Sequence, residues 1–345
     1  MVGRYRIMRS IGVGAMGEVF LGSDDSLGRR AAIKLLGLKH LENETVRERF
    51  LREARALARL SHPNLITVYE SGHIGENNRP YFAMELLEGG DVEKLLLERG
   101  PLAPGVVALI GAQAAAGLGE AARAQIIHRD VKPANLGISG QGVLKVTDFS
   151  LAKSHTIERN LTAKGFVVGT ADYIAPEQAR GEALDERADV YSLGCSLYHL
   201  LTGRPPYRAT GTEVQRYVEI MQSHVSAPVQ DPRDAGVGPV DDELAQLVMS
   251  CMDKDRERRP TFEELAPALM RVNKRVGGGL PRLTRPIFSL PTGIAVPSGP
   301  TEELQLPSPS NDHADQIPRR KGPVAVLTAL VAAVVLGLIW WATRQ

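Results

Sequence analysis

The pattern of apolar and polar positions divides the chain into an N-terminal part with strand-like runs and a longer part with helical spacing. Short apolar runs bounded by turn residues predict strands at 5–11, 18–24, 29–36 and 79–87. Between them, apolar residues at steps of three and four positions predict a helix over 43–60. The first third of the chain is therefore expected to form a sheet with one helix.

Beyond residue 91 the apolar positions follow helical spacing, and no internal repeat is apparent. Helices are predicted at 91–99, 104–124, 188–202, 212–224 and 241–251. The order of these elements predicts an α+β protein of two lobes. A small β-rich lobe is expected over about 1–86, and a larger, mainly helical lobe over about 88–275.

The composition of the chain changes after residue 275. From Gly277 to Pro318 the sequence is rich in Pro, Gly and Ser and shows no sustained apolar periodicity. Such a segment cannot bury enough apolar surface to form a core, and this composition is typical of flexible linkers. We therefore predict a folded region over 1–275 and a disordered linker over 276–321.

An uncharged run of 20 residues, Pro323 to Ala342, follows the linker. As a helix rising ~1.5 Å per residue it would cross the ~30 Å hydrocarbon core of a bilayer, which predicts a transmembrane helix over 323–342. A buried core helix is the alternative, but it would normally carry polar residues on one face. Three basic residues, 319–321, precede the run and Arg344 alone follows it, which predicts single-pass anchoring in the inner or plasma membrane with the folded region cytoplasmic.

Composition narrows the classes of function. The 345 residues carry a net charge of +1, so the basic face typical of nucleic-acid-binding proteins is not expected, nor is a nucleic-acid partner. The only cysteines, Cys195 and Cys251, both fall in predicted helices. Two cysteines so placed favour buried free thiols in a reducing compartment over a disulfide framework or a metal site.

The glycine-rich stretch "GVGAMGEV" is the first candidate for chemistry. Gly12, Gly14 and Gly17 would let the backbone approach the phosphates of a nucleotide closely, although an ordinary hairpin turn is the alternative. Because the stretch continues into a predicted strand and not a helix, it does not match a dinucleotide-binding turn.

A lysine and a glutamate follow at positions from which they could meet. Lys34 closes the apolar strand "AAIK", and Glu53 lies beside the apolar face of the predicted helix 43–60. The lysine could instead extend its ammonium into solvent. Paired with Glu53, the ammonium of Lys34 would be held in place for the phosphates of a nucleotide.

The stretch "HRDVKPANLGISGQGVLKVTDFS" gathers two acids, an amide and a lysine. Asp130, Asn135 and Asp148 supply the oxygen ligands that suit Mg²⁺ and a carboxylate that can accept a hydroxyl proton. A strand over 142–148 would place Asp148 at its end. Lys132 could neutralise charge on a phosphoryl group during transfer.

With these residues in order, the chain resembles the protein kinases, and specifically bacterial eukaryotic-like (Hanks-type) Ser/Thr kinases. The resemblance covers residues 1 to about 275 and rests on "GVGAMGEV", "AAIK", Glu53, "HRDVKPAN", "DFS", "APE", "DVYSLG" and "RRP". It implies a bilobal kinase fold that binds ATP and Mg²⁺, with Mn²⁺ as a possible replacement.

The resemblance also assigns expected roles. Asp130 would be the catalytic base, with Lys132, Lys34 and Asn135 completing the catalytic set, and Asn135 and Asp148 would hold the metal. Met84 resembles the gatekeeper and 85–87 the hinge. The implied nucleotide site consists of Ile11, Gly12, Gly14, Gly17, Val19, Ala32, Lys34, Glu53, Met84, Glu85, Leu87, Asn135 and Asp148.

Four further matching residues are expected to be structural. Glu177 and Arg259 are predicted to form a buried ion pair under the substrate-side loop, and Asp189 to lie beneath the catalytic loop. His128 is expected to pack and hydrogen-bond without acting as a base, because Asp130 fills that role in the family.

The segment between Asp148 and Glu177 carries the expected regulation. Thr162 resembles the usual autophosphorylation position, with Thr156 as the second candidate, and a phosphate there could order the segment against Arg129. An unmodified loop threonine is the alternative. Ser150 stands where the family usually has glycine, and we expect it to affect the switching of the loop more than the chemistry, since it replaces no ligand.

Together these features predict an ATP-dependent Ser/Thr protein kinase, a transferase of bacterial signal transduction that acts on protein substrates and autophosphorylates, with a homodimer as a further expectation. A membrane-tethered pseudokinase that binds nucleotide without transfer is the main alternative. A small-molecule phosphotransferase is the second, but "APE", "DVYSLG" and "RRP" resemble the protein-substrate half of protein kinases.

Overall fold

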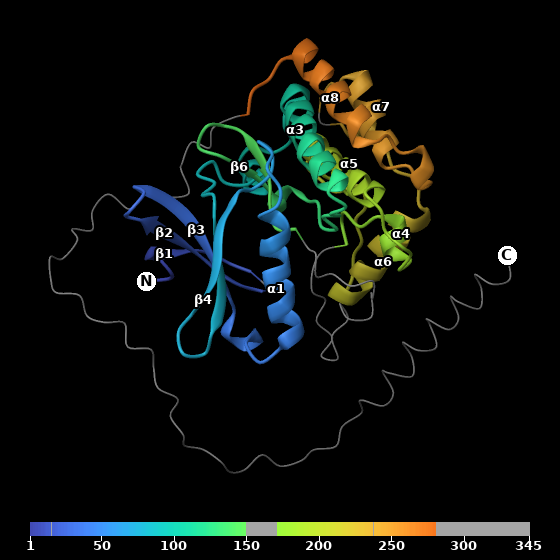
Figure 1. The fold of residues 1–345 in the computed structure, drawn as a ribbon. Helices are drawn as coiled ribbons and strands as arrows, with labels where there is room; N and C mark the ends of the chain where they lie inside the picture. The colour runs from blue at the N-terminus through green and yellow to red at the C-terminus, as the bar shows by residue number, and fades with distance from the viewer. Residues whose placement is uncertain (15, 150–170, 237, 281–345) are drawn as a thin grey trace, which may run out of the picture. The chain divides into compact units, whose positions relative to one another are not determined.

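The predicted strands form one antiparallel sheet in the computed structural model, with the order β1-β2-β3-β5-β4 (Figure 1). The structure describes residues 1–14, 16–149, 171–236 and 238–280. The strands are β1 (Arg6–Val13), β2 (Gly17–Asp24), β3 (Arg29–Leu36), β4 (Val68–Ile74) and β5 (Arg79–Met84). β4 was not predicted, because most of its residues are only half-buried at the sheet edge and alternate too weakly.

Helix α1 (Glu44–Leu57) packs on this sheet, and its buried face explains why it folds there. Phe50 and Ala54 join a cluster with Leu36 and Phe82, and the rings of Phe50 and Phe82 lie 5.1 Å apart. The helix begins at Asn43, whose side chain accepts a hydrogen bond from the Val46 N–H. It is shorter than predicted at its C-terminal end.

The second lobe is built mainly from helices. They are α2 (Val92–Arg99), α3 (Pro104–Arg123), α4 (Pro176–Ala179), α5 (Arg187–Thr202), α6 (Glu213–Ser226), α7 (Asp242–Cys251) and α8 (Phe262–Val276). α3 contacts both α5 and α8, which lie beside it in Figure 1. The predicted α+β fold, a β-rich lobe followed by a helical one, is confirmed. Cys195 and Cys251 are buried free thiols, as expected.

Two helices of this lobe were missed. α8 contains Pro267 in its interior, which obscures the helical pattern, and α4 has only four residues. The start of α8 has a local signal, because Thr261 and Glu264 form a capping box. The predicted strand at 142–148 is shorter, β7 (Leu144–Val146), and it pairs with β6 (Leu136–Ile138), which was not predicted.

Helix α3 is the one helix among the described ranges that is long and apolar enough to cross a membrane, and most of it is buried inside the lobe. The predicted span at 323–342 lies outside the described residues, as does the predicted linker apart from its first five residues. Ser150, Thr156 and Thr162 also lie outside them.

A close approach of two backbone segments joins α3 to the loop that follows α1. A Cβ at Gly117 would lie 2.6 Å from the carbonyl oxygen of Asn64, closer than any real Cβ contact allows. The Asn64 side chain donates to the Leu144 carbonyl at 2.9 Å and to Gln113 at 3.1 Å. This loop is thus held against α3 and β7.

We expect Gly117→Ala to lower the free energy of unfolding, because the added methyl group would push the Asn64 backbone away from α3. At an unobstructed helix position the same change stabilises by about 1 kcal/mol. Chemical denaturation of the two proteins measures the difference, and an unchanged or raised stability would contradict the prediction.

Candidate active site

Three segments that are distant in sequence meet at the ammonium group of Lys34. Its Nζ lies 3.2 Å from Glu53 Oε1 and 2.8 Å from Asp148 Oδ1. Lys34 comes from β3, Glu53 from the buried face of α1, and Asp148 from the second residue after β7. The contact between Lys34 and Glu53 is the one that the sequence predicts.

The charges of this cluster support one another. Burial tends to lower the pKa of Lys34, but the carboxylates of Asp148 and Glu53 outweigh it and raise that pKa above its ordinary value. The nearby ammonium in turn lowers the pKa of Asp148. Burial raises the pKa of Glu53, and Lys34 offsets part of the effect. Lys34 is therefore a cation and Asp148 an anion at neutral pH.

The loop before β6 holds a second polar cluster around Asp130. Lys132 Nζ lies 3.0 Å from Asp130 Oδ2. The side-chain amide of Asn135 donates to the backbone carbonyl of Asp130 at 2.8 Å and to its Oδ2 at 3.3 Å. The structure thus brings the three predicted residues of this loop together, with the Asp130 carboxylate facing a cation and an amide.

A carboxylate from the helical lobe fixes the backbone of this loop. Buried Asp189 of α5 accepts hydrogen bonds from the N–H groups of His128, at 2.6 Å, and Arg129, at 2.8 Å. Arg129 has a φ of 66°, which a non-glycine residue rarely adopts without such support. Burial raises the pKa of Asp189 to about 7, against the opposing effect of the two N–H donors. Its predicted place beneath the loop is confirmed.

His128 connects this loop to the segment after β7. Its ring is fully buried, contacts the Thr147 carbonyl through Nε2 at 2.8 Å, and packs on Phe149 with ring centroids 4.4 Å apart. The Asp130 N–H donates to Nδ1 of the same ring at 3.2 Å. These contacts agree with the expectation that His128 packs and hydrogen-bonds in a structural role.

The three glycines where β1 turns into β2 differ in what surrounds them. A Cβ at Gly17 would lie 1.9 Å from the Leu35 carbonyl oxygen, so strand pairing alone demands glycine there. Chain neighbours apart, no atom of the described residues lies within 4 Å of a Cβ built at Gly12, and a Cβ at Gly14 has just the Gly17 carbonyl oxygen, at 3.8 Å. Packing within the described residues therefore does not explain Gly12 and Gly14, whereas close approach of the backbone to a ligand would.

The predicted nucleotide pocket draws on four strands and the segment after β5. Ile11 lies in β1, and Val19 in β2 pairs with Lys34 in β3. Ala32 pairs with Met84 at the end of β5. The hinge residues follow at once, and the Glu85 N–H donates to the Thr67 carbonyl at 2.9 Å. Leu87, the last hinge residue, packs against the main core.

Lys145 was missed by sequence reasoning. Its Nζ lies 2.9 Å from Glu85 Oε2 and donates to the Leu65 carbonyl at 3.4 Å, so one side chain connects β7, the hinge and the loop after α1. A lysine in a short strand is usually interpreted as facing solvent, and only the distant Glu85 could have suggested otherwise.

Asn135 and Asp148 offer side-chain oxygen atoms of the kind that suits a divalent cation. Asn135 donates through its nitrogen, so its Oδ1 can act as a ligand, and the Asp148 side chain is half exposed. Within the described ranges no group of three or more His, Cys, Asp and Glu could hold a metal. A cation bound by two protein ligands would complete its coordination with phosphate oxygens and water, as Mg²⁺ does.

The predicted ion pair between Glu177 and Arg259 is present and buried. Arg259 Nη1 and Nη2 donate to the two carboxylate oxygens at 2.7 and 2.9 Å, and both side chains are at most 2% exposed. Arg259 also donates to the carbonyls of Asp253 and Arg187. The end of the segment that follows Asp148 is thereby fixed to the helical lobe.

Comparisons with known proteins agree with this geometry. The model of the protein kinase domain matches residues 5–268. The serine/threonine-protein kinase PknB of Mycolicibacterium smegmatis is 34% identical over 346 residues, covering 97% of this chain and 54% of that protein. The DNA damage-responsive serine/threonine-protein kinase RqkA of Deinococcus radiodurans is 37% identical over 265 residues, covering 75% of this chain and 38% of its own. The chain therefore spans about half of these relatives or less.

We expect Arg259→Met to cost about 3–5 kcal/mol of unfolding free energy, because it leaves the Glu177 carboxylate buried and unpaired. The double change with Glu177→Met removes both charges and should cost less than the single change. Chemical denaturation measures both, and a double variant that is less stable than the single one would refute this account.

Proposed function

The chain belongs to the protein kinase family, and we propose that it is a serine/threonine kinase that transfers the γ-phosphate of ATP to hydroxyl groups of proteins. The contact of Lys34 with both Glu53 and Asp148 carries this proposal. Protein kinases need this lysine and the metal-holding aspartate in place together, and both are present here. The named relatives are serine/threonine kinases, which supports the choice of substrate hydroxyl.

In the proposed reaction Asp130 accepts the proton of the substrate hydroxyl while the oxygen of that hydroxyl attacks the γ-phosphorus. The bond from that phosphorus to the bridging oxygen breaks, and ADP leaves. Lys132, 3.0 Å from Asp130, offsets the negative charge on the phosphoryl group during transfer. Lys34 binds the α- and β-phosphates, and Glu53 holds its ammonium in place.

Protein kinases use ATP with a divalent metal, and we take the metal to be Mg²⁺, with Mn²⁺ as a possible replacement. Asn135 and Asp148 would hold it, and it would neutralise phosphate charge. The nucleotide base would lie between Ala32 and the hinge residues 85–87. The glycine-rich stretch, where Gly12 and Gly14 leave open space, would cover the phosphates.

Protein substrates follow from the family. A homodimer that autophosphorylates in trans at Thr162 or Thr156, and single-pass attachment to the cell membrane through 323–342, are further parts of the proposal. These parts rest on the sequence: threonines in the segment after Asp148, and an uncharged run preceded by three basic residues.

We expect Asp130→Asn to lower the rate of phosphate transfer by about 10²-fold or more, since general-base catalysis contributes that much. The full chain, purified in detergent, is supplied with ATP, Mg²⁺ and a generic basic protein, and phosphorylated residues are mapped by mass spectrometry. Phosphate on serine or threonine, lost in the variant, supports the proposal. ATP binding without transfer in the wild type would instead indicate a pseudokinase.

We expect Glu53→Gln to raise the KM for ATP by about tenfold, because Lys34 loses one of its two charged hydrogen bonds. Glu44→Gln is the matched control, since Glu44 lies on the same helix, is largely exposed and contacts only Arg47 at 3.7 Å. Steady-state kinetics on both variants test this, and equal effects would show that Glu53 has no special part in binding ATP.

A further inference from the structure

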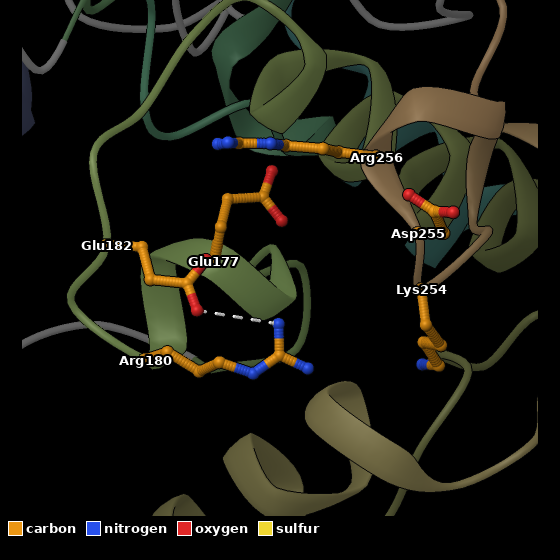
Figure 2. A pocket seen from close by; sticks show the side chains of 6 residues that line it. All are labelled: Glu177, Arg180, Glu182, Lys254, Asp255 and Arg256. Carbon is orange, nitrogen blue, oxygen red and sulfur yellow. Dashed lines mark ion pairs between the residues drawn. The ribbon is translucent and has the colours of Figure 1, made fainter.

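A charged cavity in the helical lobe is not used by the proposed function. It has a volume of about 260 Å³ and lies between α4, the segment after it and residues 254–256 (Figure 2). Every side chain that lines it carries a charge; these are Glu177, Arg180, Glu182, Lys254, Asp255 and Arg256.

Two of the acidic side chains of the cavity are engaged elsewhere. Both oxygens of Glu177 accept hydrogen bonds from Arg259. The Asp255 carboxylate accepts the Glu257 N–H at 3.1 Å and lies 3.5 Å from Arg258 Nε. The remaining acid, Glu182, is half exposed, and its nearest cation, Arg180, is 3.9 Å away, as the dashed line in Figure 2 marks.

The lysine of the cavity contacts neutral oxygen atoms. Lys254 Nζ donates to the hydroxyl groups of Tyr191, at 3.0 Å, and Tyr207, at 2.8 Å, and to the His224 carbonyl at 2.8 Å. Burial, together with the positive charges of Arg259 and Arg180, lowers the pKa of Lys254 to about 8. No carboxylate of the described residues lies within ion-pair distance of it.

Arg256 of the cavity also contacts a neutral oxygen atom. Arg256 donates to the Ala183 carbonyl at 3.2 Å. Its nearest carboxylate is Glu257, 3.7 Å from Nε, and that carboxylate makes a closer contact with Arg187. Arg256 and Lys254 thus bring positive charge to the cavity that its acids do not balance.

We propose that this cavity binds a phosphate group, either as inorganic phosphate or as a phosphorylated side chain, through Arg180, Lys254 and Arg256. A phosphate offers two negative charges and several acceptor oxygens, which suits two guanidinium groups and an ammonium group. The inference goes beyond the proposed function, because none of these residues is assigned a part in phosphate transfer.

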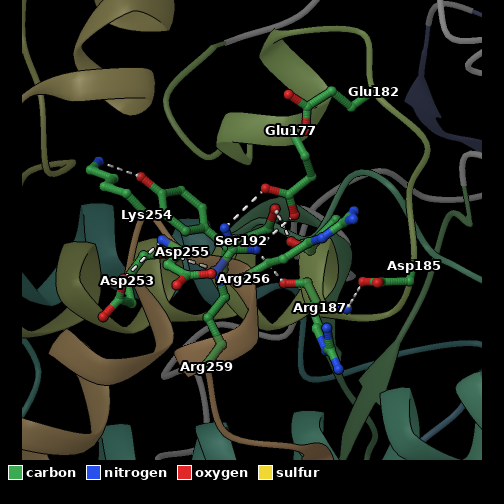
Figure 3. Close-up of polar contacts among 12 residues, drawn as sticks. Glu177, Glu182, Asp185, Arg187, Ser192, Asp253, Lys254, Asp255, Arg256 and Arg259 are labelled. Atoms are coloured by element: carbon green, nitrogen blue, oxygen red, sulfur yellow. Dashed lines mark hydrogen bonds and ion pairs between the residues drawn. The ribbon is translucent and has the colours of Figure 1, made fainter.

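The cavity lies against the side chains that fix the end of the substrate-side segment. Figure 3 draws Glu177 and Arg259 in one close-up with Lys254 and Arg256, and Glu177 itself lines the cavity. A bound phosphate would therefore contact residues adjoining the pair that holds this segment, and it would attract Lys254 away from Tyr191 and Tyr207.

Protection of Lys254 from acetylation tests the proposal. The full chain in detergent, with a non-hydrolysable ATP analogue present throughout, is treated with N-acetoxysuccinimide at constant ionic strength, set with sodium chloride. Inorganic phosphate, O-phosphoserine or a phosphoserine peptide is titrated in, and mass spectrometry follows Lys254 against exposed Lys274. We expect phosphate to protect Lys254 and leave Lys274 unchanged.

Matched variants make the test specific. Arg256→Gln should raise the phosphate concentration that gives half-maximal protection of Lys254 by about tenfold. Arg256→Lys should raise it much less. Arg271→Gln is the control, because Arg271 is exposed on α8 and does not line the cavity. Equal protection by phosphate and peptide assigns the site to the free anion, and tighter peptide binding assigns it to a phosphoprotein.

The proposal is overturned if no phosphate compound protects Lys254, or if Arg271→Gln weakens protection as much as Arg256→Gln. The acetylation test needs no phosphate transfer. A negative result would therefore overturn the phosphate site without bearing on whether the chain is an active kinase.

Discussion

The contact of one ammonium group with two carboxylates organises this protein. Lys34 contacts the carboxyl groups of both Glu53 and Asp148, so one side chain of β3 joins α1 to the segment after β7. The Asp148 carboxylate is half exposed and can still contact a further cation, which is what a divalent metal beside ATP would supply. The sheet, α1 and the segment after β7 must all be correctly placed for this cluster to exist.

The helical lobe supplies the rigid frame for the chemistry. α5 is buried along nearly its whole length, and from it Asp189 holds the backbone of the loop that carries Asp130. The pair of Glu177 and Arg259 fixes the other end of the site to the same lobe. Buried charges with partners are costly to disturb, so both contacts favour one arrangement of loops that have little regular structure of their own.

Much of this arrangement follows from local sequence signals, and the rest depends on distant contacts. Strands β1 to β3 and α1 have clear apolar patterns, whereas β4 is only half-buried and Pro267 obscures α8. Caps explain the helix boundaries, since Asn43, Asp91 and Thr212 begin helices without belonging to them. The contact of Lys34 with Glu53 could be anticipated from a strand and a helix face. That of Lys145 with Glu85 could not, because 60 positions separate them and nothing in the sequence of the hinge or of β7 indicates that the two side chains pair.

The end of α1 has a consequence for how that helix can move. Leu57 and the residues after it, Leu65 and Ile66, belong to the large core of the helical lobe, while the middle of the helix rests on the sheet. The helix is thus anchored at its C-terminal end, and a tilt would pivot there. At about 1.5 Å per residue, Glu53 lies only about 6 Å from Leu57, whereas Asn43 lies about 21 Å away. The same tilt would displace the beginning of α1 more than three times as far as Glu53. A partner that binds the beginning of the helix could therefore control the position of Glu53 finely, because a large displacement there moves Glu53 only a little.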